Sequence, residues 1–239
     1  MGNKPFAFKQ FTVHQDRCAM KVGTDGVLLG AWTTVPQGAG RILDIGAGTG
    51  LIALMLAQRC PAEDIEAIEI EEAAYEQCVA NFEASPWSDR LFCYHAGLDE
   101  LLEDEAAGPY DLIVCNPPFY SEAVSSGNRA RDRARQNSAL PFGELLEAVA
   151  QLLAPKGTFS VVLPIKEKNA FLGMAKEFGL FPSHITDVRG NPTVPSKRSL
   201  LQFTFQERGV ATKPLVVEEA RHRYTEAYRK LTHDFYLKM

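Results

Sequence analysis

The chain has little of what secreted, membrane-spanning and metal-stabilised proteins depend on. Its five cysteines include no Cys-x-x-Cys pair, and their odd number favours reduced thiols over a disulfide framework or a structural metal. No segment approaches the roughly 18 uninterrupted apolar residues of a membrane-spanning helix. The amino terminus lacks the basic stretch and the long apolar run of a secretion signal. These absences predict a cytoplasmic protein without a metal or a membrane partner.

The sequence also lacks internal repeats and low-complexity linkers. Its 239 residues, 46% of them hydrophobic, are enough to bury one full core, so we expect a single domain over residues 1–239. Apolar runs alternate with helical patterns, which predicts a parallel sheet. The expected strands are 41–45, 64–69, 91–95, 110–115, 158–163, 181–189 and 199–206, and the expected helices are 49–59, 71–84, 98–105, 141–153, 166–178 and 217–231.

The two halves of the chain differ in the sign of their charge: basic residues are few in the first half and outnumber acidic residues in the second. Residues 1–127 hold 7 Lys and Arg against 19 Asp and Glu, whereas residues 128–239 hold 18 against 11. The overall charge of −5 would count against a nucleic-acid partner, but binding depends on the local field near a surface. The basic second half therefore allows such a partner.

A glycine-rich motif joins the strand at 41–45 to a helix rich in Leu and Ala. Its sequence is Gly46-Ala47-Gly48-Thr49-Gly50, the pattern of the first βα unit of a nucleotide-binding sheet. Leu51 occupies the place of the third glycine of the dinucleotide fingerprint, which argues against NAD.

Two carboxylates near this turn indicate the kind of ligand. Asp44 lies just before the turn, poorly placed for a pyrophosphate but able to accept a hydrogen bond from a cationic amine. Glu69 ends the next strand, about 19 residues beyond Gly50, where it can accept both hydroxyls of a ribose. A ligand with a ribose, a positive end and no phosphate fits both groups.

The tetrapeptide Asn116-Pro117-Pro118-Phe119 directly follows the strand 110–115, at the end where open α/β sheets place their ligand crevice. A proline cannot donate a backbone hydrogen bond, while the Asn116 amide can both accept from and donate to a planar NH2 group. Taken alone, the tetrapeptide is equally a Pro-Pro turn that ends a strand. Together with the glycine motif, it indicates a site for a planar amine.

The two motifs resemble those of the class I S-adenosylmethionine-dependent methyltransferases, and the tetrapeptide resembles that of members that methylate an exocyclic or amide nitrogen. The resemblance implies a Rossmann-like α/β fold with a mostly parallel seven-stranded sheet, a terminal antiparallel hairpin and helices on both faces. It implies S-adenosyl-L-methionine as the cofactor. The implied cofactor-binding residues are Thr24, Asp44, Gly46, Gly48, Gly50, Glu69, Asp99 and Asn116.

The resemblance also divides the domain. Residues 1–40, with Thr24, would cap the cofactor; residues 41–206 would form the core and residues 207–239 a helical extension. Asp99 lies in the region that contacts adenine in this fold, but a carboxylate in the first turn of a helix is favoured there in any case.

Both ends of the chain narrow the resemblance. Residues 11–32 and 231–239 look like the bacterial tRNA(Val) adenine-N6 methyltransferases, which modify the adenosine beside the anticodon, and the similarity runs over almost the whole chain. It implies a tRNA partner, tRNA(Val) with its anticodon stem-loop, and we expect a monomer. One departure is Phe119, where Tyr is common among adenine methyltransferases.

The resemblance gives catalytic roles to Asn116, Pro117, Pro118 and Phe119. A sulfonium methyl is already a strong electrophile, so the enzyme must align it with the attacking nitrogen. Hydrogen bonds from the target NH2 to the Asn116 side chain and the Pro117 carbonyl would favour a pyramidal nitrogen. Either Phe119 or Tyr120 would stack on the base.

Four arginines follow the tetrapeptide and are candidate RNA-phosphate contacts, with a solvated charged loop as the alternative. They are Arg129, Arg131, Arg133 and Arg135. A second basic and aromatic cluster at 221–230 is better explained by an amphipathic terminal helix.

Three other functions share parts of the pattern. Methylation of a glutamine amide in a protein needs similar geometry, but such enzymes usually have a helical amino-terminal domain, for which residues 1–40 are too few. A DNA-adenine enzyme would be expected to bring a target-recognition domain. A non-catalytic nucleotide-binding or RNA-binding module would show no turnover.

Overall fold

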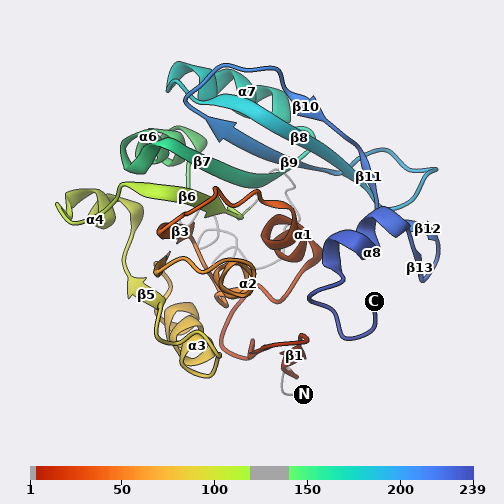
Figure 1. The fold of residues 1–239 in the computed structure, drawn as a ribbon, viewed down its shortest axis with the longest axis horizontal. Coiled ribbons are helices and arrows are strands. Elements are labelled where there is room, and N and C mark those ends of the chain that lie inside the picture. The colour runs from red at the N-terminus through yellow and green to blue at the C-terminus, as the bar shows by residue number, and fades with distance from the viewer. Residues whose placement is uncertain (1–3, 119–139) are drawn as a thin grey trace, which may run out of the picture.

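A computed structural model describes residues 4–118 and 140–239, which form one large sheet flanked by helices (Figure 1). The strands lie in the order β10-β8-β9-β7-β6-β3-β4-β5, with β11 also paired to β8. Their bounds are β3 Arg41–Ile45, β4 Asp64–Glu69, β5 Leu91–His95, β6 Tyr110–Cys115, β7 Leu153–Pro164, β8 Phe181–Arg189, β9 Arg198–Thr204, β10 Ala211–Thr212 and β11 Leu215–Val216. The seven predicted strands are all present, and β10 and β11 extend the sheet beyond β8.

The sheet is mostly parallel, as predicted. β3 pairs in parallel with β4 and β6, and β6 pairs in parallel with β7, whereas β9 is antiparallel to both β7 and β8. The central strands are nearly continuous runs of buried residues because helices cover both faces. This arrangement brings the carboxyl ends of β3, β4, β5 and β6 to one edge, and the site residues follow those strands.

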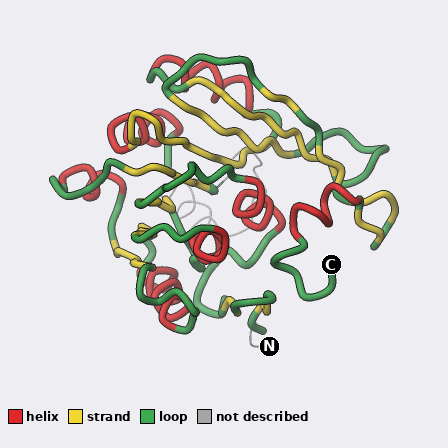
Figure 2. The backbone as a smooth tube through the Cα atoms, in the orientation of Figure 1, coloured by secondary structure: helices red, strands yellow, loops and turns green. Residues whose placement is uncertain are grey.

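Helices cover both faces of the sheet, as Figure 2 shows. Leu112 and Val114 of β6 pack into one core, while Ile113 and Cys115 pack into the other. The first core includes residues of α1 Thr24–Trp32, α2 Leu51–Arg59, α3 Glu72–Glu83 and α8 Glu226–Thr232, and the second includes residues of α4 Leu98–Glu103, α6 Phe142–Leu152 and α7 Lys168–Glu177. Alternate strand residues thus anchor the two layers.

The predicted helix over 217–231 is wrong in its first part. That part forms a small hairpin, β12 Glu218–Ala220 and β13 Arg223–Tyr224, in which His222 has a φ of 63° that a helix does not contain. Helix α8 begins only after Thr225, whose hydroxyl accepts a hydrogen bond from the Tyr228 backbone N–H. The last 33 residues of the chain therefore mix short strands with one helix.

The two ends of the chain lie side by side (Figure 1). A short hairpin of β1 Phe6–Ala7 and β2 Thr12–Val13 precedes α1, and Phe8 forms a β-bridge with Tyr236. The Lys9 backbone N–H donates to the Phe235 carbonyl at 2.8 Å. Among the residues described, no helix is long and apolar enough to cross a membrane.

Candidate active site

The glycine turn between β3 and α2 is open on one side. Gly46 and Gly48 have φ values of 70° and 56°, in the left-handed region that residues with a side chain rarely adopt. A Cβ added to either glycine would meet no atom of the described residues within 4 Å. The backbone of this turn is therefore exposed to a ligand that approaches from the carboxyl edge of the sheet.

Gly50, the last glycine of the motif, does a different job. It caps the amino end of α2 with a φ of 77°, and a Cβ there would lie 2.5 Å from Phe82 and 2.8 Å from the Cys78 sulfur. The absence of a side chain at Gly50 thus lets the turn pack against α3. The sequence motif groups the three glycines together, whereas the fold separates two open positions from one packed position.

Asp44 is fully buried and only half satisfied. Its Oδ2 accepts a hydrogen bond from the Ala53 backbone N–H at 3.1 Å, but its Oδ1 has no partner in the described part of the chain. Burial raises the pKa of Asp44 to about 7; the Ala53 hydrogen bond opposes this shift and the nearby Glu69 charge adds to it. A buried oxygen without a donor, below an open glycine turn, fits a ligand that brings a donor or a positive charge.

Glu69 closes the glycine turn from the neighbouring strand. One carboxylate oxygen accepts from the Gly48 backbone N–H at 2.8 Å, and the other accepts from the Glu71 backbone N–H at 2.9 Å. Both oxygens are thus held by the backbone at the carboxyl end of β4. The Glu69 carboxylate, which is predicted to bind a ribose, is therefore held in place next to the open glycines.

Ile70, which directly follows β4, is not among the residues predicted from the sequence but lies beside them at the edge. This side chain is 66% exposed, and its Cδ1 lies 3.7 Å from the position of a Cβ on Gly97, just before α4. Asp99 lies in the first turn of α4 and is exposed. This position also agrees with the alternative explanation, that a carboxylate is favoured at the start of a helix whatever its function. Because Gly97 adjoins both residues, Ile70 and Asp99 lie on the same side of the edge. Only the exposure of Ile70 distinguishes it from the buried isoleucines, and exposure is not visible in the sequence.

Asn116 lies at the same level of the sheet edge as the glycine turn. Ile45 is opposite Cys115 in the parallel β3–β6 pair, so the residues that follow them, Gly46 and Asn116, are neighbours across the edge. The Asn116 Oδ1 is buried and has no hydrogen-bond partner among the residues described. A planar NH2 group would satisfy this oxygen.

Helix α1 reaches the edge at its amino end. A Cβ added to Gly26 would lie 4.0 Å from the Asn116 Nδ2, and the preceding Asp25 forms a 2.7 Å ion pair with Arg198 of β9. Thr24 is the first residue of α1 and is exposed. The structure therefore brings Thr24, Asp44, Gly46, Gly48, Glu69, Asp99 and Asn116 to one edge.

Six residues predicted for catalysis or substrate binding lie outside the described residues. They are Phe119, Tyr120, Arg129, Arg131, Arg133 and Arg135. Of the tetrapeptide, Asn116, Pro117 and Pro118 are described, and Pro117 is buried.

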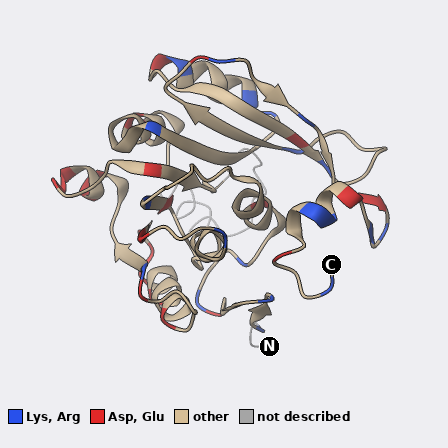
Figure 3. Cartoon of the chain, viewed as in Figure 1, with Lys and Arg blue, Asp and Glu red and all other residues tan. Residues whose placement is uncertain are grey.

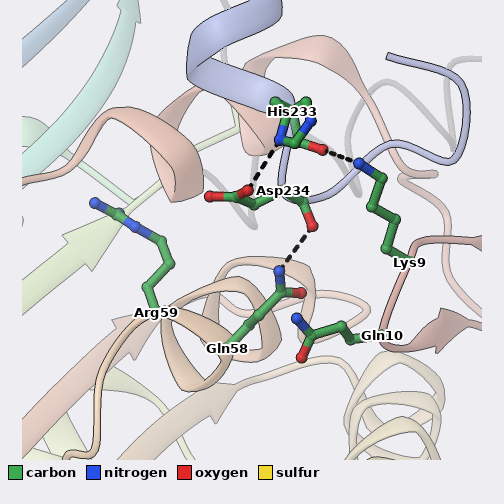
Figure 4. A pocket seen from close by; sticks show the side chains of 6 residues that line it. All are labelled: Lys9, Gln10, Gln58, Arg59, His233 and Asp234. Carbon is green, nitrogen blue, oxygen red and sulfur yellow. Dashed lines mark hydrogen bonds and ion pairs between the residues drawn. The ribbon is translucent and has the colours of Figure 1, made fainter.

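A polar cavity of about 530 Å³ lies away from this edge (Figure 4). It is lined by Lys9, Gln10, Gln58, Arg59, His233 and Asp234. Lys9 donates to the His233 carbonyl at 2.6 Å and Gln58 donates to the Asp234 carbonyl at 2.8 Å. These contacts join the two chain ends to the carboxyl end of α2, whose nine residues separate the cavity from the glycine turn by roughly 13 Å. The cavity is therefore part of the junction between the termini.

Comparison with solved structures supports the fold. A predicted O-methyltransferase from Agrobacterium tumefaciens is 16% identical and superposes with a TM-score of 0.66 over 88% of this chain and 96% of that one. TrmK from M. capricolum, solved with S-adenosyl-homocysteine, is 11% identical with a TM-score of 0.53 over 81% of this chain and 72% of that one. At such low identity these likenesses establish the fold alone.

Comparison of sequences establishes the family. The pattern described as Methyltransferase small domain matches residues 23–184. A protein of Flavobacterium psychrophilum named tRNA1(Val) (adenine(37)-N6)-methyltransferase is 58% identical over 98% of this chain and its own full length. Proteins of the same name from Bacteroides fragilis and Trichodesmium erythraeum are 48% and 43% identical, each over the full length of both chains. With a class I methyltransferase fold and full-length identity at this level, the chain belongs to the tRNA1(Val) (adenine(37)-N6)-methyltransferase family.

Proposed function

We propose that this protein transfers a methyl group from S-adenosyl-L-methionine to N6 of adenosine 37 in tRNA1(Val). The observation that carries the proposal is the buried Oδ1 of Asn116, which has no partner in the described part of the chain and lies beside an open glycine turn. The names of full-length relatives supply the nucleotide and the tRNA.

The cofactor would lie along the acidic side of the edge. Gly46 and Gly48 leave room for the methionine part, and Asp44 offers to its positive groups an oxygen that no described residue contacts by a hydrogen bond. Glu69 is held where it can accept from ribose hydroxyls, and Ile70 presents an exposed apolar side chain to the adenine ring. We assign Thr24 and Asp99 to the two ends of the same site.

The proposed reaction mainly requires that the methyl group and the attacking nitrogen be aligned. When bound, S-adenosyl-L-methionine supplies an electrophilic methyl group on a sulfonium. Asn116 Oδ1 would accept one hydrogen bond from the adenine NH2 and the Pro117 carbonyl the other. These bonds favour a pyramidal nitrogen, whose lone pair is less delocalised into the ring and is available to attack the methyl carbon. Effective molarities of well-aligned groups correspond to roughly 7–11 kcal/mol, and part of this is available here. The alkylated nitrogen is acidic and releases its proton after transfer, so no strong base is required.

The base must leave its stack to reach Asn116. Turning a nucleotide outward costs a few kcal/mol, and the cost is smallest where the base is unpaired, as in an anticodon loop. We propose that Phe119 or Tyr120 stacks on the turned base and that Arg129, Arg131, Arg133 and Arg135 contact RNA phosphates. All groups assigned to the site come from one chain, so we propose that the protein acts as a monomer. Because its proposed substrate is a tRNA, we propose that it acts in the cytoplasm.

The decisive experiment uses isotope-labelled cofactor with a tRNA1(Val) transcript and a matched transcript in which adenosine 37 is replaced by guanosine. After digestion to nucleosides, we expect label only in N6-methyladenosine and only from the first transcript. Label in another nucleoside, or equal labelling of both transcripts, would refute the assignment. In a separate incubation with a glutamine-containing protein in place of the transcripts, label in that protein would favour the amide-methyltransferase alternative.

A further inference from the structure

Three chain segments meet at the sheet edge on the far side of Asn116 from the cofactor residues. Pro164, at the end of β7, is opposite Arg198, at the start of β9, and Arg198 is also opposite Val188 near the end of β8. Cys115 is opposite Val161, so Asn116 is level with Val162. Pro164 therefore lies beyond Asn116 in the direction of the strands. The ends of β7 and β8 and the start of β9 therefore border the acceptor side of the site.

Cations gather on these segments. We name Lys166, Lys168, Arg189, Lys197 and Arg198 the basic edge. The segments 164–168, 187–190 and 197–199, which hold these five residues, contain two acidic residues, Glu167 and Asp187. Asp187 accepts from Lys168 at 2.8 Å and from the Ser199 hydroxyl at 2.8 Å, so its charge is already shared. The basic edge thus keeps a net positive charge.

Two exposed lysines stand together in this group. The Ile165 backbone N–H donates to the Lys197 carbonyl at 3.0 Å, which places Lys166 and Lys197 on adjoining backbone segments. Both residues are exposed. Lysine is a compact charge on a flexible stem, which suits a phosphate whose position varies along an RNA backbone.

The basic edge is directly linked to the acceptor site. Arg198 forms its 2.7 Å ion pair with Asp25, and the next residue in α1, Gly26, is the one whose Cβ position lies 4.0 Å from the Asn116 Nδ2. On the opposite side of Asn116, the end of β4 and the starts of α3 and α4 carry carboxylates, so a polyanion approaching there would be repelled. An RNA strand that delivers a base to Asn116 is therefore directed to the basic edge. Figure 3 colours the Lys and Arg and the Asp and Glu residues along the chain.

We propose that Lys166 and Lys197, supported by the rest of the basic edge, bind backbone phosphates of the tRNA next to the target nucleotide. This inference rests on the proposed function, because it assumes an RNA acceptor. It concerns residues that neither the glycine motif nor the tetrapeptide indicates, and it predicts that they act on tRNA binding and not on cofactor binding.

The test is the double variant Lys166→Glu/Lys197→Glu, compared with the wild type for binding to the tRNA1(Val) transcript over a range of salt concentrations. We expect affinity at about 0.1 M salt to fall by about tenfold or more, and the slope of log K against log salt to flatten by about 1.4 if each lysine contacts one single-stranded phosphate. Cofactor affinity should stay within about twofold, which also shows that the variant is folded. The milder Lys166→Gln/Lys197→Gln variant should flatten the slope equally, since the same contacts are lost.

The matched control is Lys156→Glu/Lys176→Glu, which changes charge equally at two exposed lysines, one near the amino end of β7 and one at the carboxyl end of α7. Its tRNA affinity should stay close to that of the wild type. Equal losses in both double variants would mean that only overall charge matters, and an unchanged salt slope in the Lys166/Lys197 variants would remove these residues from the interface; either result overturns the inference while wild-type methylation of the transcript leaves the proposed function intact. A wild type that fails to methylate the transcript would refute the function itself, and this inference with it.

Discussion

The two sides of Asn116 differ in charge and in how their charged groups are held. On the β4 and β5 side, the strand ends and the helices after them carry Glu69, Glu71, Glu72, Asp99 and Glu100, which we name the acidic flank. On the other side lies the basic edge. The net charge of −5 averages over both and describes neither. Each side carries the charge opposite to that of the group it is proposed to hold. The acidic flank would hold a sulfonium cation, and the basic edge would hold a phosphate backbone.

The two sides also differ in rigidity. In the acidic flank, the Glu69 carboxylate accepts from two backbone N–H groups, and the Glu100 side chain accepts from the Gly97 N–H at 2.8 Å. In the basic edge, Lys168 and Arg198 form side-chain ion pairs, and the exposed Lys166 and Lys197 lie in the connections after β7 and before β9. Backbone contacts fix a small ligand precisely, whereas exposed lysines tolerate a variable partner. The comparison therefore predicts that substitutions will separate cofactor binding from RNA binding.

The largest expected effect is at the boundary between the two sides. Asn116→Ala removes the amide proposed to orient the target nitrogen, and we expect turnover on tRNA to fall by about 10² to 10³, by analogy with the loss of one preorganised polar group. Cofactor affinity should change by less than about tenfold. Single-turnover kinetics and calorimetry measure the two quantities. Near-normal turnover would exclude Asn116 from the mechanism.

The glycine motif gives the next effect, on stability. Gly50→Ala adds a Cβ against Phe82 and Cys78 at a positive φ, so strain and overpacking together should cost about 3 kcal/mol of the free energy of unfolding. Gly46→Ala meets open space and should cost only about 1–2 kcal/mol, the price of the left-handed conformation alone. Urea unfolding measures both. If Gly46→Ala proved equally destabilising, the open side of the turn would not be open.

Asp44→Asn tests the acidic side through the cofactor. Loss of a charge-assisted hydrogen bond is worth about 1.5–3 kcal/mol, so cofactor affinity should fall by about 10- to 150-fold. Asp111→Asn is the matched control, because Asp111 also accepts backbone hydrogen bonds, from Gly40 at 2.8 Å and Arg41 at 3.2 Å, but at the amino end of the sheet. Calorimetry on the two variants should show a loss only in the first. Equal affinities would place the cofactor elsewhere.

The smallest effect is a pH dependence of stability. The pKa of Asp44 is raised from 3.8 to about 7 on folding, so its stabilising contribution is complete below about pH 4 and is lost as pH rises through about 7. Relative to Asp44→Asn, the wild type without cofactor should lose about 1 kcal/mol of unfolding free energy between pH 6 and 7. Urea titrations at several pH values measure this difference. A difference that is constant or grows with pH would contradict the raised pKa.

The sequence was a good guide wherever a local pattern has one structural outcome. Strands 41–45, 64–69, 91–95 and 110–115 were predicted with the bounds that the structure has, because buried parallel strands are apolar runs between turn residues. The helix over 217–231 was wrong because its residues suit a helix locally, yet the first of them pair as a hairpin beside β11, after the Val217 and Glu218 N–H groups donate to carbonyls at the end of β8. Tertiary pairing overrode local preference there.

The site shows the same division. Asp44, Glu69 and Asn116 could be predicted to lie near one another because the carboxyl ends of adjacent parallel strands must meet, whatever the rest of the fold does. Ile70 was missed because its exposure depends on α4 and on the turn before it. The basic edge was missed because Lys166 and Lys197 are 31 residues apart and are joined only by the pairing of β7 with β9.

The sequence by itself determined the chemistry of this protein: a glycine turn, two carboxylates and an amide-proline tetrapeptide fix which groups are available, because each motif sets its own backbone locally. Only the tertiary structure decided how these groups are arranged. It separated the open glycines from the packed one, left one oxygen each of Asp44 and Asn116 without a partner within residues 4–118 and 140–239, and assembled a basic edge opposite an acidic flank. Such properties arise from contacts between residues distant in the chain, whose geometry no local pattern encodes.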